Sequence, residues 1–129
     1  MTHTGTATTT VVYADVEGGA ARMTEESTDL LRSVFSRYGG EILETADDAV
    51  LVVFAASSDA VAASVALQRR LALDGSPLQL ALGIDAGDVS WDHGTCFGQP
   101  TVVARRLAVG APPGRVQVSS VVRLMAGSR

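Results

Sequence analysis

GGEILETADDAVLVVF, residues 39–54, is the most informative stretch of this chain. The β-branched and apolar residues at 42–43 and 50–54 are typical of strands, and the small and acidic residues between them, at 46–49, are typical of a turn. The stretch therefore predicts a β-hairpin that carries an acidic pair at its tip.

A second informative stretch is VVYAD, residues 11–15, which is typical of a strand that ends in a carboxylate and leads into the turn residues Gly18 and Gly19. If this strand lies beside the hairpin in one sheet, Asp15 and Asp48 can reach the same point at the edge of that sheet. Carboxylate oxygens suit Mg²⁺ and Mn²⁺, which also bind substrate phosphates and water. The two stretches together predict a divalent-metal site.

The composition predicts one folded domain. The chain has 129 residues, of which 47% are hydrophobic and 19% are charged, and this is enough apolar material for a core. We expect a flexible N-terminus over residues 1–8 and a single domain over residues 9–129. No apolar run approaches the roughly 20 residues that span a bilayer, and the polar start MTHTGTATTT lacks the pattern of a signal peptide. These features predict a cytoplasmic protein with no membrane partner.

The charged and sulfur-containing residues exclude several functions. A net charge of −4 argues against nucleic-acid binding, which requires clustered Lys and Arg. The single Cys96 excludes an internal disulfide, and with His3 and His93 it is too sparse for a zinc site. All ten basic residues are Arg, and the chain contains neither Lys nor Asn. A mechanism that needs either side chain must therefore take it from another molecule.

Periodicity places the other elements around these two stretches. Thr24 is a helix N-cap followed by acidic residues and Gly39 is a helix stop, so a helix is predicted between them. The other predicted elements are helices over 60–73, from about 100 to 109 and after Ser119 or Ser120, and strands over 78–84, 87–91 and 116–118. The order is β-α-β-β-α-β followed by a strand, a helix and a strand, which predicts an α+β sandwich of the ferredoxin-like type.

Four blocks of sequence carry a resemblance to a known family. They are VVYADVEGG at 11–19, RYGGEILETADDAVLVVF at 37–54, LALGIDAGDV at 80–89, and FGQPTVVARRL at 97–107 followed by PPGRVQVSS at 112–120. In this order they resemble the catalytic domain of the class III adenylyl and guanylyl cyclases, particularly the small bacterial cyclase-homology domains. The resemblance covers nearly the whole chain and implies a sandwich of the nucleotide cyclase type.

The resemblance implies a reaction and a metal site. In the family, two aspartates hold two metal ions against the triphosphate of ATP or GTP, and the ribose 3′-hydroxyl attacks the α-phosphate and releases pyrophosphate. The matching aspartates are Asp15 and Asp48, so the implied cofactor is a pair of Mg²⁺ or Mn²⁺ ions, with the Val16 carbonyl as a further ligand at the substrate site. The turn that follows is implied to offer backbone N–H groups to phosphates; it consists of Glu17, Gly18, Gly19 and Ala20.

Further positions are implied to contact the substrate. The family arginine that stabilises the transition state matches Arg106, with Arg105 as the alternative register. Glu44 stands where the family has a lysine that contacts the purine, and Gln99 stands at the position that helps choose between adenine and guanine. Val102 stands where the family has a transition-state asparagine. The lysine and asparagine functions are therefore missing from this chain.

Family active sites form across a head-to-tail dimer, so the resemblance implies a homodimer or a heterodimer with another cyclase domain, with ATP or GTP as substrate. A homodimer would lack the lysine and the asparagine, and we expect little or no activity from it. Three hypotheses follow: a divergent cyclase domain that keeps a metal and nucleotide site, half of a heterodimeric cyclase, and an inactive dimerisation or regulatory binding module. The diguanylate-cyclase palm is a remote alternative, because the chain lacks its Gly-Gly-acid-acid-Phe hairpin.

Overall fold

The computed structural model describes residues 5–19, 22–44 and 50–127. The elements follow in this order: β1 (Gly5–Val16), α1 (Glu25–Arg37), β2 (Glu41–Glu44), β3 (Val50–Phe54), α2 (Ser57–Leu73), β4 (Leu80–Asp92), β5 (Thr95–Phe97), α3 (Gln99–Val109), β6 (Val116–Val118) and α4 (Ser120–Gly127). The α+β class predicted from the sequence is confirmed.

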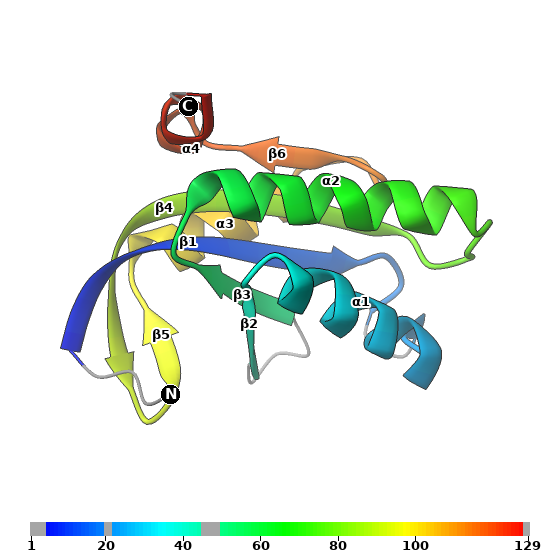
Figure 1. The fold of residues 1–129 in the computed structure, drawn as a ribbon, viewed down its shortest axis with the longest axis horizontal. Helices are drawn as coiled ribbons and strands as arrows, with labels where there is room; N and C mark the ends of the chain where they lie inside the picture. Colours follow the sequence, from blue (N-terminus) through cyan, green and yellow to red (C-terminus); the bar gives the residue numbers. More distant parts are fainter. Residues whose placement is uncertain (1–4, 20–21, 45–49, 128–129) are drawn as a thin grey trace.

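The sheet has the order β2-β3-β1-β4-β5, and β6 pairs with β4 (Figure 1). β1 is antiparallel to both β3 and β4, and β2 is antiparallel to β3. The first four strands with α1 and α2 therefore form the predicted ferredoxin-like βαββαβ unit. The added β6 runs parallel to β4, and the connection between these two strands includes α3.

β4 corrects one prediction, because it is a single strand of 13 residues. The sequence predicted two strands, 78–84 and 87–91, with a break at Asp85 and Ala86. The break is wrong because β1 pairs with β4 without interruption from Gly5↔Trp91 to Val16↔Leu80, and a partner strand overrides the weak strand preference of Asp and Ala. Because Gly5 already pairs with Trp91, β1 includes residues 5–8, which belong to the range 1–8 that the sequence predicted to be flexible.

The hairpin and the first helix agree with the sequence. β2 pairs with β3 from Glu41↔Val53 to Glu44↔Val50, which confirms the two predicted strands. The connection between them, which includes Asp48, lies outside the described residues. The predicted cap of α1 is confirmed, because the Thr24 hydroxyl accepts the Ser27 N–H at 3.0 Å and the Ser27 hydroxyl accepts the Thr24 N–H at 2.8 Å.

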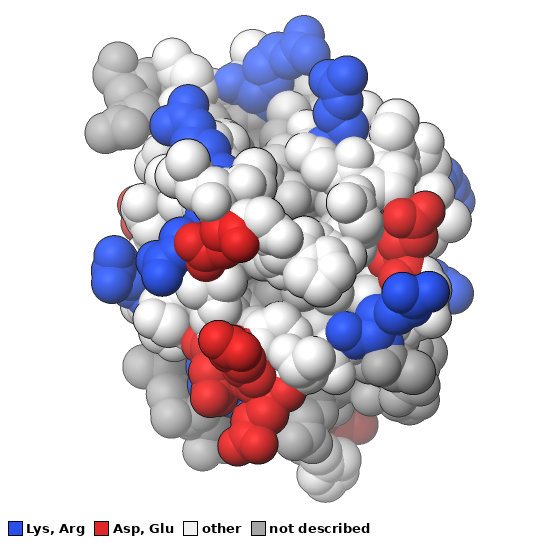
Figure 2. Space-filling view, turned by 90° about the vertical axis from the view of Figure 1, so that its right-hand side faces the viewer, with Lys and Arg blue, Asp and Glu red and all other residues white. Residues whose placement is uncertain are grey.

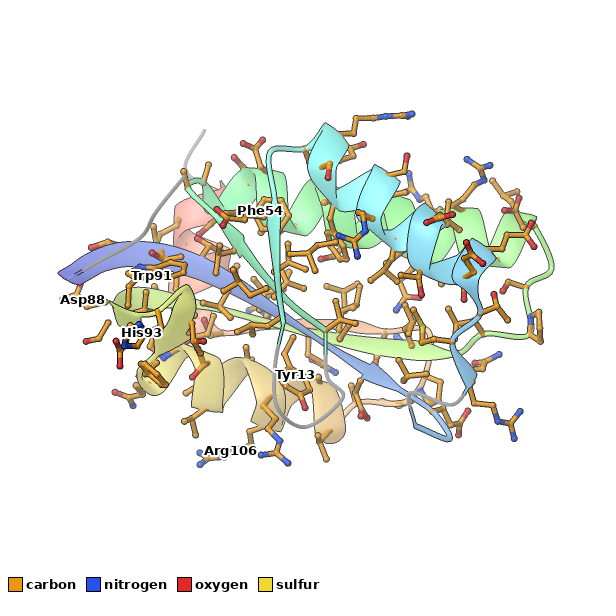
Figure 3. All side chains as sticks on the ribbon, turned by 90° about the horizontal axis from the view of Figure 1, so that it is seen from below. Tyr13, Phe54, Asp88, Trp91, His93 and Arg106 are labelled. Atoms are coloured by element: carbon orange, nitrogen blue, oxygen red, sulfur yellow. The ribbon has the colours of Figure 1, made fainter. Side chains whose placement is uncertain are left out.

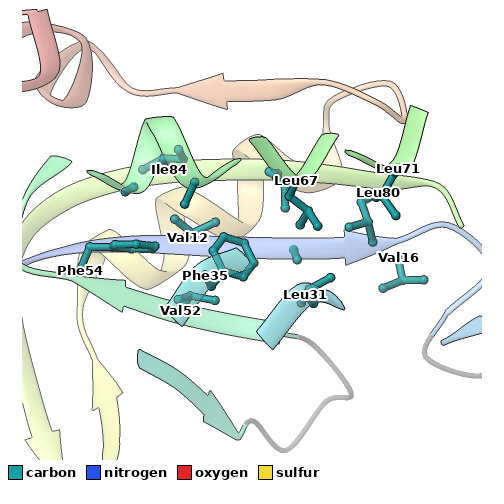
Figure 4. Packing of buried hydrophobic residues seen from close by; sticks show 14 of the residues in the cluster. Val12, Val16, Leu31, Phe35, Val52, Phe54, Leu67, Leu71, Leu80 and Ile84 are labelled. Carbon is teal, nitrogen blue, oxygen red and sulfur yellow. The ribbon is translucent and has the colours of Figure 1, made fainter. Parts of the chain in front are cut away.

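The main core lies between the sheet and the helices α1, α2 and α4 (Figures 1 and 4). Side chains alternate along β1, and Val12, Ala14 and Val16 point into this core. Phe35 of α1 is fully buried there, and its ring packs edge-to-face on Phe54 of β3 with centroids 6.0 Å apart. This aromatic pair joins α1 to the sheet.

Of the described helices, α3 packs on the opposite face of the sheet (Figure 3). Val11 and Tyr13 of β1 belong to this second core together with Ala104 and Ala108 of α3. Gly83 of β4 lies directly under the helix, because a Cβ built at Gly83 would overlap the Ala104 carbonyl oxygen and lie 2.6 Å from the Ala108 nitrogen. The glycine lets the helix backbone approach the strand.

α4 ends the described chain. The Ser119 hydroxyl accepts the Val122 N–H at 3.3 Å, which agrees with the predicted serine cap. Val122 is buried, whereas three apolar side chains of the helix are exposed: Val121, Leu124 and Met125. Within the described ranges, every helix is too short or too polar to cross a membrane.

Cys96 of β5 gives a pH-dependent prediction. Burial raises the pKa of the Cys96 thiol, because the protein interior disfavours the thiolate. The shift contributes fully to the free energy of unfolding at pH values below the ordinary thiol pKa of the unfolded chain, about 8.5. This contribution is lost as the pH rises toward the higher pKa of the folded state. We expect the free energy of unfolding in urea to fall more between about pH 7.5 and about pH 9.5 for the wild type than for Cys96→Ala. Parallel pH profiles of the two proteins would contradict this.

Candidate functional site

Asp15 lies near the end of β1, on the face of the sheet that carries α3. Because side chains alternate along a strand, Asp15 points to the same side of the sheet as Val11 and Tyr13. It pairs with Ala81 of β4. Its side chain is half-buried, and it forms no hydrogen bond or ion pair within the described part of the chain. No group in the described ranges therefore competes with a ligand for this carboxylate.

Asp48, the other predicted metal ligand, lies outside the described residues. The structure does show that β3 begins beside the Asp15 end of β1, since Val50 pairs with Ala14. Among the described residues no group of three or more His, Cys, Asp or Glu side chains could hold a metal ion. The pairing of Asp15 with Asp48 therefore stays a prediction.

The turn after β1 uses much of its own hydrogen-bonding capacity. The N–H of Glu17 donates to the Gln79 carbonyl at 2.9 Å, and the N–H of Gly19 donates to the Val16 carbonyl at 2.9 Å. Gly18 and Gly19 both have positive φ, +85° and +84°, which explains the glycine pair. Two of the N–H groups that the sequence assigned to phosphates are therefore already donated within the chain. Ala20 lies outside the described residues.

α3 brings Gln99, Val102 and Arg106 onto one exposed face. These residues are spaced i, i+3 and i+7 along the helix, and the buried Ala104 and Ala108 lie on the opposite face. Val102 is 54% exposed, and Arg106 forms no ion pair within the described residues. The helix thus presents three predicted substrate residues in a single stripe.

The position of α3 on the sheet puts Arg106 on the same side as Asp15. The turn of α3 that contains Ala104 and Ala108 packs on Gly83, which lies two residues beyond Ala81, the partner of Asp15. Figure 3 shows Arg106 and Tyr13 on this side of the sheet and Phe54 on the other side. The metal-binding candidate and the arginine candidate therefore share one face.

Two positions in the predicted set stay open. Glu44 is the last residue of β2, but its side chain is not among those described. Arg105, the alternative to Arg106, is also exposed on α3, so exposure does not distinguish the two.

The sequence reasoning missed two charged residues near these candidates. Asp85 is 7% exposed and lies on the α3 face of β4. Leu82 and Ile84 point into the main core on the other face, and because side chains alternate along a strand, this pattern could have predicted the side on which Asp85 lies. Arg22 is exposed in the segment before α1, and it is the first basic residue of the chain. Its position just after the Gly18-Gly19 turn is a signal that could have marked it.

The end of the molecule at which β1 terminates carries charges of both signs. Figure 2 views this end, and its largest group of acidic side chains lies in the lower part of the view, with basic side chains scattered around the margin. A highly charged anion would meet repulsion from the acidic group. Binding a polyphosphate here would therefore need cations, from arginine or from metal ions.

The sequence matches no protein-family model and no curated protein. The structure is similar to an adenylate/guanylate cyclase/hydrolase from Silicibacter pomeroyi, with a TM-score of 0.85 and 23% identity over 96% of this chain and 82% of that chain. It is also similar to a non-canonical dimeric guanylyl cyclase domain of the RhoGC fusion protein from Blastocladiella emersonii, with a TM-score of 0.77 and 18% identity over 95% of this chain and 85% of that chain. The guanylate cyclase domain of RhGC from Catenaria anguillulae, solved in complex with GTP, gives a TM-score of 0.73, 18% identity and coverage of 92% and 81%. The fold is therefore that of adenylyl and guanylyl cyclase catalytic domains.

Proposed function

We propose that this chain is a divergent cyclase-type domain that binds a nucleoside triphosphate with a divalent cation and converts it weakly, or not at all, to a cyclic nucleotide and pyrophosphate. The observation that carries the proposal is the half-buried carboxylate of Asp15, which has no partner among the described residues and lies on the face that also presents Arg106. The cyclase fold and the GTP complex of one similar structure support it.

Asp15 and Asp48 are the donors that we propose for a divalent cation. Asp15 offers a hard carboxylate oxygen with no competing partner among the described residues, and Asp48 would supply the second carboxylate. Mg²⁺ or Mn²⁺ bound there would neutralise charge on the phosphates and lower the pKa of the attacking hydroxyl. Asp15 would hold that cation at the end of β1.

Arg106 would stabilise charge on the phosphate that undergoes transfer. Its guanidinium is exposed on the outer stripe of α3, so it can reach a nucleotide held by a second copy of the domain. Gln99 and Val102 share the stripe, but Val102 has no polar group to offer. Losing one preorganised donor costs about 10²–10³ in rate, which is why we propose weak turnover.

Asp15→Asn tests this function. The substitution removes the negative charge that attracts the cation, and we expect the affinity for Mn·ATP or Mn·GTP in calorimetry to fall by at least about 10-fold. Asp29→Asn on the exposed side of α1 is the matched control and should bind as the wild type does. Circular dichroism checks that both variants fold. Equal affinities of Asp15→Asn and the wild type would refute the proposed site.

A second function, an inactive dimerisation module, is favoured by the apolar side chains that are exposed on and beside the outer face of α3: Phe97, Val102 and Val109. Sedimentation together with the same titrations separates the two functions. A stable dimer that binds no Mn·nucleotide and forms no cyclic AMP or cyclic GMP would favour the module.

A further inference from the structure

The side chain of Arg22 lies across the backbone of Gly18. A Cβ built at Gly18 would be 2.9 Å from Cγ of Arg22 and 2.9 Å from its Nε, closer than real contacts allow. The local fold explains this position, because the N–H of Arg22 donates to the Gly19 carbonyl at 3.0 Å and turns the chain back over Gly18. Gly18 thus makes room for an arginine directly after the strand that ends near Asp15.

The guanidinium of Arg22 has no partner in the described part of the chain. It forms no ion pair and no side-chain hydrogen bond there, and the residue is exposed. Arg22 is also the only basic residue before Arg32, in a stretch that contains Glu17, Glu25 and Glu26. Along the sequence, Arg22 is the basic residue nearest to this turn.

The backbone of the turn leaves a role for such a cation. The N–H groups of Glu17 and Gly19 are already donated to carbonyls of the chain, so they are not free for phosphate oxygens. A guanidinium offers several N–H donors in a planar fork that matches two phosphate oxygens, and its positive charge strengthens each bond. Arg22 can therefore supply both the donors and the charge.

We propose that Arg22 binds the polyphosphate chain of the metal-bound nucleotide, and that Gly18 is needed so that the arginine stem can lie across the turn. This inference rests on the proposed function and names a binding residue for the same site. Arg22 contacts the phosphates that leave as pyrophosphate, whereas Asp15 holds the cation. Recognition of the substrate then depends on its phosphates more than on its base.

Arg22→Gln is the first test. The probes are the manganese complexes of ATP, AMP and inorganic tripolyphosphate, each titrated by calorimetry. We expect the variant to bind ATP and tripolyphosphate at least about 10-fold more weakly and to change AMP binding little, because a charge-assisted bidentate contact is lost. Arg123→Gln, an exposed arginine of α4, is the control and should match the wild type for all three probes.

Gly18→Ala and Gly19→Ala form a matched pair for the second test. Both glycines have nearly the same positive φ, so alanine is strained equally at the two sites, but a Cβ at Gly19 meets no atom within 4 Å. Only the Cβ at Gly18 displaces the Arg22 side chain. We expect tripolyphosphate affinity to fall about 10-fold further in Gly18→Ala than in Gly19→Ala, at a similar loss of stability.

The outcomes separate this inference from the proposed function. If Arg22→Gln binds ATP as tightly as the wild type does, the role of Arg22 is overturned and the proposed function stands. Binding of tripolyphosphate that depends on Arg22, without binding of ATP or GTP, would support the role of Arg22 and overturn the proposed function. A wild type that binds neither ATP nor tripolyphosphate would overturn both.

Discussion

Gly83→Ala should lower the free energy of unfolding by about 3 kcal/mol or more, because overpacking against a helix backbone cannot be relieved by a side-chain rotation. The new Cβ would overlap the Ala104 carbonyl oxygen and lie 2.6 Å from the Ala108 nitrogen and 3.0 Å from the Leu107 Cβ. These atoms belong to, or are attached to, the backbone of α3. The helix must move as a unit, and Arg106 moves with it.

Urea unfolding followed by the fluorescence of Trp91 measures this loss. Trp91 is the single tryptophan, and it belongs to the same core as Ala104 and Ala108. Gly87→Ala is the matched control on β4, since a Cβ there would contact only the Pro100 ring, at 3.1 Å. We expect the control to change stability by less than about 1 kcal/mol. Equal unfolding midpoints for the two variants would show that α3 does not approach β4 most closely at Gly83.

Phe35→Ala should cost about 3–5 kcal/mol, the range for removing a buried aromatic ring from a packed core. Phe35 has no exposed surface, and its ring lies at 67° to the ring of Phe54 with centroids 6.0 Å apart. The substitution leaves a cavity between α1 and the sheet and also removes the edge-to-face contact. For a chain of this size, such a loss is a large part of the total stability.

Thermal and urea unfolding of Phe35→Ala and Leu73→Ala test the core. Leu73 of α2 is also a large apolar residue, but it is 84% exposed, so its replacement should change stability by less than about 0.5 kcal/mol. A Phe35→Ala variant as stable as Leu73→Ala would contradict the position of Phe35 in the core. Because α1 follows the turn that contains Arg22, this variant should also weaken polyphosphate binding.

Local patterns predicted most of the elements. Thr24 was identified as a cap from its position before two acidic residues, and the structure shows the reciprocal hydrogen bonds with Ser27 that make it one. The strands of the hairpin and β6 were found from their β-branched residues. These signals act between residues a few positions apart, so they can be read without knowledge of the fold.

Long-range pairing decided what local patterns missed. Asp85 and Ala86 have weak strand preference, and only their position opposite β1 keeps β4 continuous through them. The same reasoning holds for the candidate site. The resemblance read from the sequence implied that the Glu17 N–H binds a phosphate. In the structure, the register of β1 with β4 places the Glu17 nitrogen 2.9 Å from the Gln79 carbonyl oxygen, and the N–H donates to that carbonyl instead.

The chain's residues specified which chemical groups are present: a strand that ends in Asp15, a helix that carries Gln99, Val102 and Arg106, and no Lys or Asn. The tertiary structure decided where those groups point. α3 packs on the sheet through Ala104, Ala108 and Gly83, and this leaves the Arg106 stripe facing outward, because a helix can bury only one side. Likewise, the fold of the turn brings Arg22 over Gly18, because the hydrogen bond from its N–H to Gly19 closes the chain at that point.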